Sequence, residues 1–203
     1  MPISNHSFIY SNIYIYRIIM SFLYLGGYKE RFRNVENLLD VDSNSSLTEL
    51  CFGDIYLAKW CYKNKVNWEG IDINDNFVRF ALNQGFSARC INIRGFPKLR
   101  KSSVIIIMGS LYHFEDILPM LIDYIMQSCN RFIISEPIKN LSSNPGLLGW
   151  IARRSANAGQ GDEVFRFSEL TLIDKINEIS NGRYTIINHG ISGKDIILEL
   201  RWS

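Results

Sequence analysis

A glycine-containing turn between an apolar run and an amphipathic segment constrains the fold of this chain more than any other feature. Residues 47–50 are mainly apolar, Gly53 lies in the turn that follows, and residues 56–64 carry apolar side chains at helical spacing. A second apolar run, residues 66–73, contains Asp72, nineteen residues after Gly53. This order predicts a parallel β-α-β unit with an acid at the carboxyl end of its second strand.

A unit of this kind is a nucleotide-binding layout, because the crevice at the carboxyl ends of parallel strands holds the ligand and the acid accepts hydrogen bonds from ribose hydroxyls. A dinucleotide fold has three glycines in this turn, whereas this turn has Gly53 alone. The turn therefore serves a diphosphate poorly. Glu49, at the end of the first strand, suits a ligand with positive charge. S-adenosylmethionine carries an ammonium and a sulfonium group and no phosphate.

Residues 49–55 read Glu-Leu-Cys-Phe-Gly-Asp-Ile. They resemble the first motif of the class I S-adenosylmethionine-dependent methyltransferases, an acid followed by three glycines at alternate positions. Cys51 and Ile55 replace the first and third glycines, and the segment looks like the acid-Leu-Cys-Cys-Gly-Asp variant of many uncharacterised members. The resemblance spans residues 47–137 and continues more loosely to the C-terminus. It implies S-adenosylmethionine as the cofactor and a methyltransferase activity.

The whole pattern predicts an α/β three-layer sandwich with a seven-stranded, mostly parallel sheet whose last strand is antiparallel. The most hydrophobic run, residues 103–108, is predicted to be the central buried strand. A closing pair of strands is typical of the resembled family and is not expected of a plain dinucleotide fold. The expected strands cover residues 46–50, 68–73, 87–91, 103–108, 130–135, 184–188 and 195–201, with a turn at 190–193 and a loop at 109–114.

The length of 203 residues fits a single methyltransferase domain. Residues 1–40 are predicted to form an N-terminal helical cap, with helices over residues 8–25 and 28–39, that packs on the sheet edge or covers the crevice. Residues 138–166 are punctuated by Asn, Ser, Gly and Pro, which indicates an active-site lid or loop.

Charge and cysteine content favour a cytoplasmic protein without membrane insertion. The net charge is only +2, and the apolar segment 8–25 contains Arg17 and several polar residues, so a membrane span is not expected; a membrane-surface helix is the minority alternative. The four cysteines show no C-x-x-C pairing, which indicates buried reduced thiols and no metal cluster.

The resemblance implies a cofactor site at the carboxyl ends of the strands. Glu49 would lie beside the cofactor's amino group, Asp72 would hold the ribose hydroxyls, and Asn92 stands where relatives often carry an Asp that bonds the adenine amino group. The competing interpretations are a helix-initiating acid for Asp72 and a polar turn residue for Asn92. The implied cofactor residues are Glu49, Cys51, Gly53, Asp72, Ile73, Asn92, Met108 and Gly109.

Methyl transfer from a sulfonium requires alignment of the acceptor and, for a hydroxyl or amine, removal of a proton. His113 is the best-placed candidate base and Tyr112 a weaker one; a packed loop in which the imidazole bonds only the main chain is the alternative. Glu136 is a candidate substrate ligand. Arg153 and Arg154 would suit an anionic acceptor, unless they belong to a solvated surface.

The leading prediction is methyl transfer to oxygen or nitrogen of a small-molecule acceptor, such as a metabolite, a sugar or a natural-product intermediate. Residues 109–114 lack the Asn/Asp/Ser-Pro-Pro-aromatic box of nucleic-acid amino-methyltransferases, and no basic stripe is visible, so no nucleic-acid partner is expected. The alternatives are a methyltransferase-like binding protein without turnover and, more weakly, an NAD-linked enzyme. The oligomeric state cannot be read from the sequence.

Overall fold

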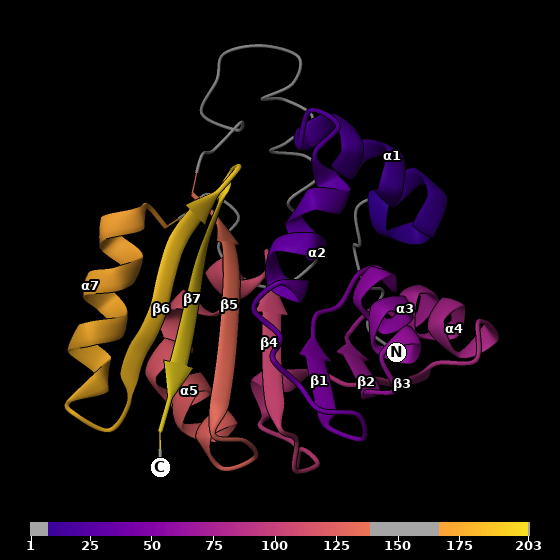
Figure 1. Cartoon of the computed structure of the whole chain (residues 1–203). Coiled ribbons are helices and arrows are strands. Elements are labelled where there is room, and N and C mark those ends of the chain that lie inside the picture. The colour runs from indigo at the N-terminus through magenta and orange to yellow at the C-terminus, as the bar shows by residue number, and fades with distance from the viewer. Residues whose placement is uncertain (1–7, 139–166, 203) are drawn as a thin grey trace.

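The computed structural model describes residues 8–138 and 167–202, and these form a three-layer α/β sandwich around one sheet (Figure 1). The strand order is β3-β2-β1-β4-β5-β7-β6; strands β1 to β5 run parallel, and β7 runs antiparallel to β5 and β6. The predicted seven-stranded fold with an antiparallel last strand is confirmed. The strands are β1 (Ser46–Leu50), β2 (Asn67–Asp72), β3 (Ser87–Cys90), β4 (Val104–Met108), β5 (Arg131–Pro137), β6 (Thr185–Ser192) and β7 (Asp195–Arg201).

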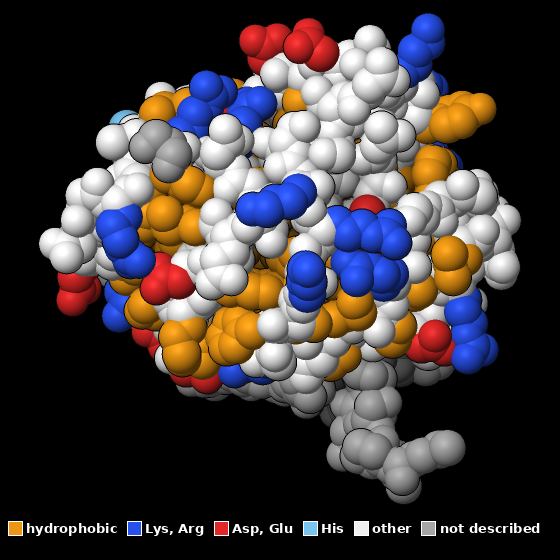
Figure 2. All heavy atoms as spheres, turned by 90° about the horizontal axis from the view of Figure 1, so that it is seen from below, with side chains coloured by type: hydrophobic (Ala, Val, Ile, Leu, Met, Phe, Trp, Pro, Cys, Tyr) orange, Lys and Arg blue, Asp and Glu red, His pale blue; other side chains and the backbone are white. Residues whose placement is uncertain are grey.

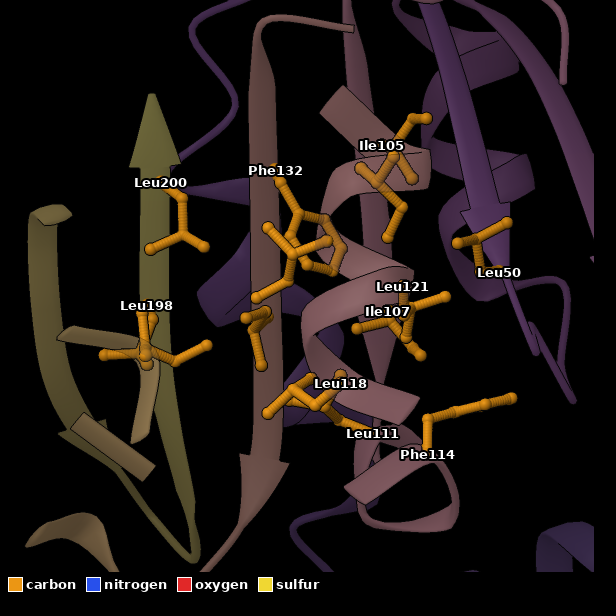
Figure 3. Packing of buried hydrophobic residues seen from close by; sticks show 14 of the residues in the cluster. Leu50, Ile105, Ile107, Leu111, Phe114, Leu118, Leu121, Phe132, Leu198 and Leu200 are labelled. Carbon is orange, nitrogen blue, oxygen red and sulfur yellow. The ribbon is translucent and has the colours of Figure 1, made fainter. Parts of the chain in front are cut away.

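The central strand β4 divides the core into two layers. Its side chains Ile105 and Ile107 pack in the cluster with α5 (Leu118–Met126) and α7 (Glu169–Ser180), and Figure 3 shows Leu118 and Leu121 of α5 beside them. Its other side chains join the cluster formed with α2 (Tyr28–Glu36), α3 (Tyr56–Lys63) and α4 (Asp75–Asn83). All five β4 residues are buried, as the unbroken apolar run predicted.

The N-terminal helices lie at the carboxyl-terminal edge of the parallel strands (Figure 1). The predicted helix over residues 8–25 is divided into a 3-10 turn, η1 (Phe8–Ser11), and α1 (Ile13–Leu23). The division occurs at Asn12, whose side chain accepts a hydrogen bond of 2.8 Å from the Tyr14 N–H and so begins α1.

Three local predictions were wrong. The turn expected at residues 190–193 is strand, because β6 continues to Ser192 and the reversal takes place at Gly193, whose φ is +62°. The loop expected at residues 109–114 contains a 3-10 helix, η3 (Leu111–Ile117). Cys90 is exposed rather than buried, although all four cysteines are free thiols. Residues 139–166 of the predicted lid, with Arg153 and Arg154, lie outside the described residues.

Candidate active site

The turn after β1 keeps a left-handed geometry although it has lost two glycines. Cys51, at the first glycine position, has a φ of +53°, and Gly53 has a φ of +57°. Ile55, at the third position, has a φ of −97° and is fully buried, so no glycine is needed there. A non-glycine residue in the left-handed region is uncommon and costs about 1 kcal/mol or more. Cys51 therefore keeps the left-handed backbone conformation of the turn despite this strain.

Asp72 joins this turn to the end of β2. Its Oδ2 accepts a hydrogen bond of 3.1 Å from the Gly53 N–H, and its Oδ1 accepts one of 2.8 Å from the Asn74 N–H. Asn74 in turn is the N-cap of α4, since its side chain accepts from the Asn76 N–H. The carboxylate is thereby fixed at the crossover between β1 and β2, with its two oxygens on main-chain donors.

Glu49 is a fully buried carboxyl group at the end of β1. Its Oε2 accepts a hydrogen bond of 2.9 Å from the Trp68 indole N–H, and its Oε1 has no partner among the residues that the structure describes. Burial raises the pKa of Glu49 to about 8; the Trp68 donor and Arg31 oppose this shift, whereas the nearby Asp54 adds to it. The Glu49 carboxyl is therefore stabilised either by keeping its proton or, when ionised, by a cation beside it.

Helix α1 is bound directly to the turn. The Tyr16 hydroxyl oxygen lies 2.8 Å from the position that a Cβ atom at Gly53 would occupy. Arg17 donates from Nε and Nη2 to the Asp54 carboxylate, at 2.9 and 2.7 Å, and Asp54 is fully buried. Helix α1 thus contacts the turn through Tyr16 and Arg17.

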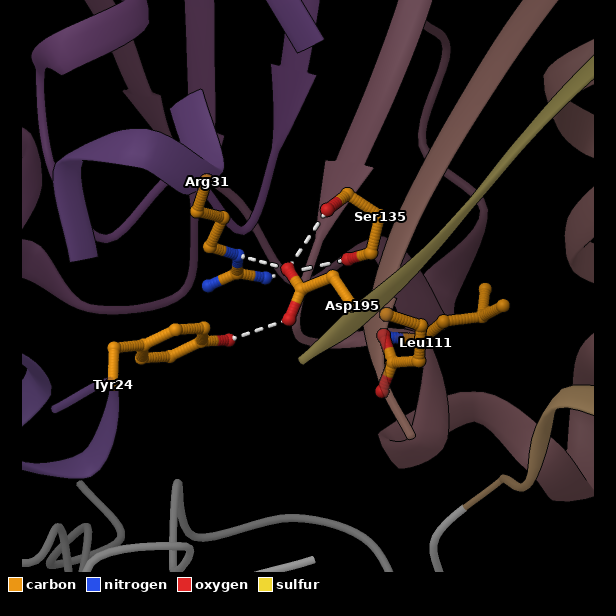
Figure 4. Close-up of polar contacts among 6 residues, drawn as sticks. Tyr24, Arg31, Leu111, Ser135 and Asp195 are labelled. Carbon is orange, nitrogen blue, oxygen red and sulfur yellow. Dashed lines mark hydrogen bonds and ion pairs between the residues drawn. The ribbon is translucent and has the colours of Figure 1, made fainter. Parts of the chain in front are cut away.

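A buried ion pair connects α2 to the far side of the crevice (Figure 4). Arg31 Nε donates to Asp195 Oδ2 at 2.6 Å, and its Nη2 donates to the Ser135 carbonyl at 3.3 Å. The Asp195 carboxylate also accepts from the Tyr24 hydroxyl at 3.0 Å and from the Ser135 hydroxyl at 2.9 Å. Sequence reasoning missed this cluster, because Arg31 and Asp195 are 164 residues apart and neither lies in a motif.

Gly109 lies against this guanidinium at the end of β4. It has a φ of +65°, and its N–H donates to the Ser135 carbonyl at 2.7 Å. A Cβ atom at this position would overlap the Arg31 guanidinium. Glycine is therefore required here both by the backbone and by the close approach of Arg31.

The candidate base His113 lies in η3 and is buried together with Tyr112. Their ring centroids are 3.9 Å apart with an interplanar angle of 40°. The Arg94 guanidinium donates to the His113 carbonyl and forms two bonds of 2.9 Å with the Asp116 carboxylate, which ties η3 to the loop after β3. Arg94 thus holds the main chain at His113 in place.

Glu136 is fully buried at the end of β5 and accepts hydrogen bonds from the N–H groups of Leu111 and Tyr112, at 3.0 and 3.4 Å. Burial raises its pKa to about 7, and the bond from the Leu111 N–H opposes the shift. In this structure the carboxylate fixes the beginning of η3, and a direct contact with substrate stays a prediction.

The remaining candidate residues lie at or just after the ends of β2, β3 and β4. Ile73 is half-buried, and Met108 is buried at the end of β4. Asn92 is exposed, and its side-chain oxygen accepts from the Arg94 N–H at 3.0 Å, so it also acts as the N-cap of a short 3-10 turn.

Comparison with known proteins gives relatives by structure alone, since no protein-family profile and no curated protein matches the chain. A complex of DhpI with SAH has a TM-score of 0.63 and 12% identity, covering 97% of this chain and 98% of that one. The magnesium protoporphyrin IX methyltransferase ChlM from Synechocystis PCC 6803, with bound SAH, has a TM-score of 0.61 and 16% identity, covering 87% and 84%. An rRNA methylase from Escherichia coli has a TM-score of 0.60 and 12% identity, covering 96% and 74%.

The chain has the class I S-adenosylmethionine-dependent methyltransferase fold. In this methyltransferase fold the predicted residues Glu49, Gly53 and Asp72 converge at the carboxyl ends of β1 and β2. Two surface hollows lined by described residues lie at the opposite, amino-terminal edge; the larger, of about 410 Å³, is lined by residues such as Ser46, Arg100 and Lys101.

Two further features concern metals and membranes. Within residues 8–138 and 167–202, no group of three or more His, Cys, Asp or Glu side chains could hold a metal ion. None of the helices in these ranges is long and apolar enough to cross a bilayer.

Proposed function

We propose that this chain binds S-adenosylmethionine at the carboxyl ends of β1 and β2 and transfers its methyl group to oxygen or nitrogen of a small molecule. The observation that carries the proposal is the buried Glu49 carboxyl, whose Oε1 has no partner among the described residues. It lies in a region where acids outnumber bases. The buried acids at this edge are Glu49, Asp54, Asp72, Glu136 and Asp195, and their basic partners are Arg17 and Arg31.

This charge distribution favours a cationic nucleoside over a dinucleotide. A sulfonium or ammonium group beside these acids would be attracted by the carboxylates and would favour loss of the Glu49 proton, whereas a diphosphate would be repelled by the carboxylates and would oppose that loss. Asp72 would accept bonds from the ribose hydroxyls, and Gly53 would allow the backbone to approach the methionine part. The NAD-linked alternative therefore has less support than the methyltransferase.

A small-molecule acceptor has more support than nucleic acid. Figure 2 shows the molecule from below, that is, from the amino-terminal ends of the parallel strands. Several Lys and Arg side chains gather on this surface. Arg100 and Lys101 line the hollow at this edge, so these basic side chains face away from the crevice. A polyanion bound at the crevice would instead meet the buried acids around Glu49.

Within the proposed site, His113 or Tyr112 would remove the acceptor's proton, and Glu136 would hold η3 so that these side chains face the methyl group. Arg153 and Arg154 would bind an anionic acceptor. Replacement of His113 by Asn should lower turnover by a hundredfold or more, on the order expected for loss of a general base, while leaving cofactor affinity unchanged. Equal turnover would remove His113 from the mechanism.

Titration calorimetry with S-adenosylmethionine, S-adenosylhomocysteine and NAD tests the proposal. We expect binding of the first two and none of NAD at millimolar concentration. A mass-shift screen of acceptors, including RNA oligonucleotides, then distinguishes an enzyme from a binding protein without turnover. If neither sulfur nucleoside binds, the proposed function is wrong; if RNA alone is methylated, the small-molecule acceptor is wrong.

A further inference from the structure

Arg31 uses only part of its hydrogen-bonding capacity. A guanidinium has five N–H donors, and those of Arg31 make two bonds, from Nε to Asp195 and from Nη2 to the Ser135 carbonyl. Its Nη1 donates to no residue in the part of the chain that the structure describes. The side chain is 5% exposed, and Nη1 is not among the buried atoms without a partner, so this donor keeps some access to solvent. A charged donor that is both unbonded and accessible can bind an acceptor of a ligand.

The unused donors lie at the crevice. The close approach to Gly109 places Nη1 and Nη2 at the end of β4, between the half of the sheet that holds Gly53 and Asp72 and the half that holds Ser135. A ligand that lies across the end of β4 would therefore meet the guanidinium. Helix α2, which carries Arg31, is fixed there by Tyr28 and Phe32, both buried in the core.

Arg131 provides a comparison at the opposite edge of the same two strands. Its Nε donates to Glu199 at 2.6 Å and its Nη2 donates to the Leu38 carbonyl at 2.7 Å, which repeats the pattern of Arg31 with Asp195 and Ser135. Arg131 lies at the first residue of β5, away from the carboxyl ends of the parallel strands. The two residues thus differ chiefly in whether they face the crevice.

We propose that Arg31 is an oxyanion-binding residue of the site and that its free donors bind a ligand carboxylate or phosphate. This inference rests on the proposed function. A guanidinium binds such groups through two parallel N–H bonds, and Asp195 holds Arg31 in place for this contact. The oxyanion comes either from the amino-acid end of the cofactor or from the acceptor. Both sources supply the same chemistry, and they are separable by experiment.

The test compares Arg31→Lys with the matched control Arg131→Lys, because both changes remove a buried arginine that is paired in the same way. Calorimetry would use S-adenosylhomocysteine, 5′-methylthioadenosine, which lacks the amino-acid end, and inorganic phosphate added to protein saturated with S-adenosylhomocysteine. If the cofactor supplies the oxyanion, Arg31→Lys should weaken S-adenosylhomocysteine by roughly ten- to hundredfold and leave 5′-methylthioadenosine unchanged.

If the acceptor supplies the oxyanion, Arg31→Lys should leave both nucleosides unchanged and abolish phosphate binding. If Arg31→Lys and Arg131→Lys behave alike with all three ligands, Arg31 is a structural ion pair and the inference is wrong. Failure of the proposed function gives a different result, because the unchanged protein would then bind neither nucleoside.

Arginine side-chain NMR of the unchanged protein covers the case in which Arg31→Lys does not fold. Signals of Arg131, assigned through Arg131→Lys, serve as the internal reference. The inference predicts that S-adenosylhomocysteine or phosphate shifts the signals of a second buried arginine and not those of Arg131. No shift of any buried arginine would overturn it.

Discussion

The main-chain N–H of Gly53 donates a hydrogen bond of 3.1 Å to the carboxylate of Asp72. The two residues belong to different strand ends, and this bond fixes the turn after β1 against the tip of β2. The candidate ribose ligand is therefore also a support of the cofactor turn, and a change at Asp72 should affect both.

Replacement of Asp72 by Asn should weaken S-adenosylhomocysteine binding by roughly ten- to hundredfold. An amide has only one acceptor oxygen, whereas Gly53 and Asn74 present two N–H donors and the ribose presents further ones. Asp75→Asn is the control, since Asp75 lies three residues further on and its side chain is 53% exposed. Equal affinities of the two variants, measured by calorimetry, would show that Asp72 does not bind the nucleoside.

The left-handed conformation of Cys51 predicts the result of two substitutions at that position. Cys51→Val should lower the free energy of unfolding by about 1–3 kcal/mol, because a β-branched residue is strained at a φ of +53°. Cys51→Gly should change it by less, since relief of strain offsets the lost side chain. Denaturant unfolding measures both. Cys129→Val, at a half-buried thiol with ordinary φ, should not show the penalty, and a loss as large as that of Cys51→Val would contradict this explanation.

Glu49 predicts a pH dependence of stability. Because its pKa is raised from 4.5 to about 8 in the folded state, the native protein retains a proton that the unfolded chain has lost between these values. The free energy of unfolding should therefore fall as pH rises from about 4.5 to 8, by at most about 1.4 kcal/mol per pH unit for this one group. Glu136, with a pKa of about 7, adds to the same trend.

Glu49→Gln should make this dependence shallower, whereas Glu30→Gln, on the exposed side of α2, should leave it unchanged. Denaturant unfolding at pH 6, 7 and 8 gives the slopes. Cofactor binding at pH 7 should also release a proton in the unchanged protein and not in Glu49→Gln, which calorimetry in two buffers of different ionisation enthalpy detects. If the unchanged protein and Glu49→Gln show the same slope and the same proton release, Glu49 neither causes the pH dependence of stability nor loses a proton when the cofactor binds.

Contact between Tyr16 and Gly53 predicts an energetic coupling between them. Gly53→Ala should lower the free energy of unfolding by about 1–3 kcal/mol, because φ is +57° and the new Cβ would lie 2.8 Å from the Tyr16 hydroxyl. Part of this loss should disappear when Tyr16→Ala is also present, and a double-mutant cycle measures that part. Gly182→Ala is the control: its φ is +76°, but no atom lies within 4 Å of the added methyl group. A purely additive result for Gly53 would show that Tyr16 does not rest on the turn.

Local sequence patterns were sufficient for most of the sheet. The β4 run and the last strand, Asp195–Arg201, were predicted because each depends on neighbouring residues. The turn at 190–193 failed because Gly190 suggested a break; β6 is an edge strand, where a glycine is tolerated, and Gly190 pairs with Ile197.

The missing part of the site depends on distant contacts. No periodicity or motif indicates that Arg31 pairs with Asp195, or that Tyr16 lies over Gly53. The placement of α1 and α2 at the crevice follows from packing between segments that are far apart in sequence, which a pattern within one window does not contain.

The cluster around Asp195 has a consequence for the order in which the protein is made. Tyr24 bonds Asp195, and Lys194 Nζ donates to the Leu23 carbonyl at 2.7 Å, each across 171 residues. During translation, the residues after α1 can form these two bonds only once the β6–β7 hairpin has left the ribosome. The crevice is therefore completed only after β7 has been synthesised, and a nascent chain stalled before β7 should not retain a nucleoside.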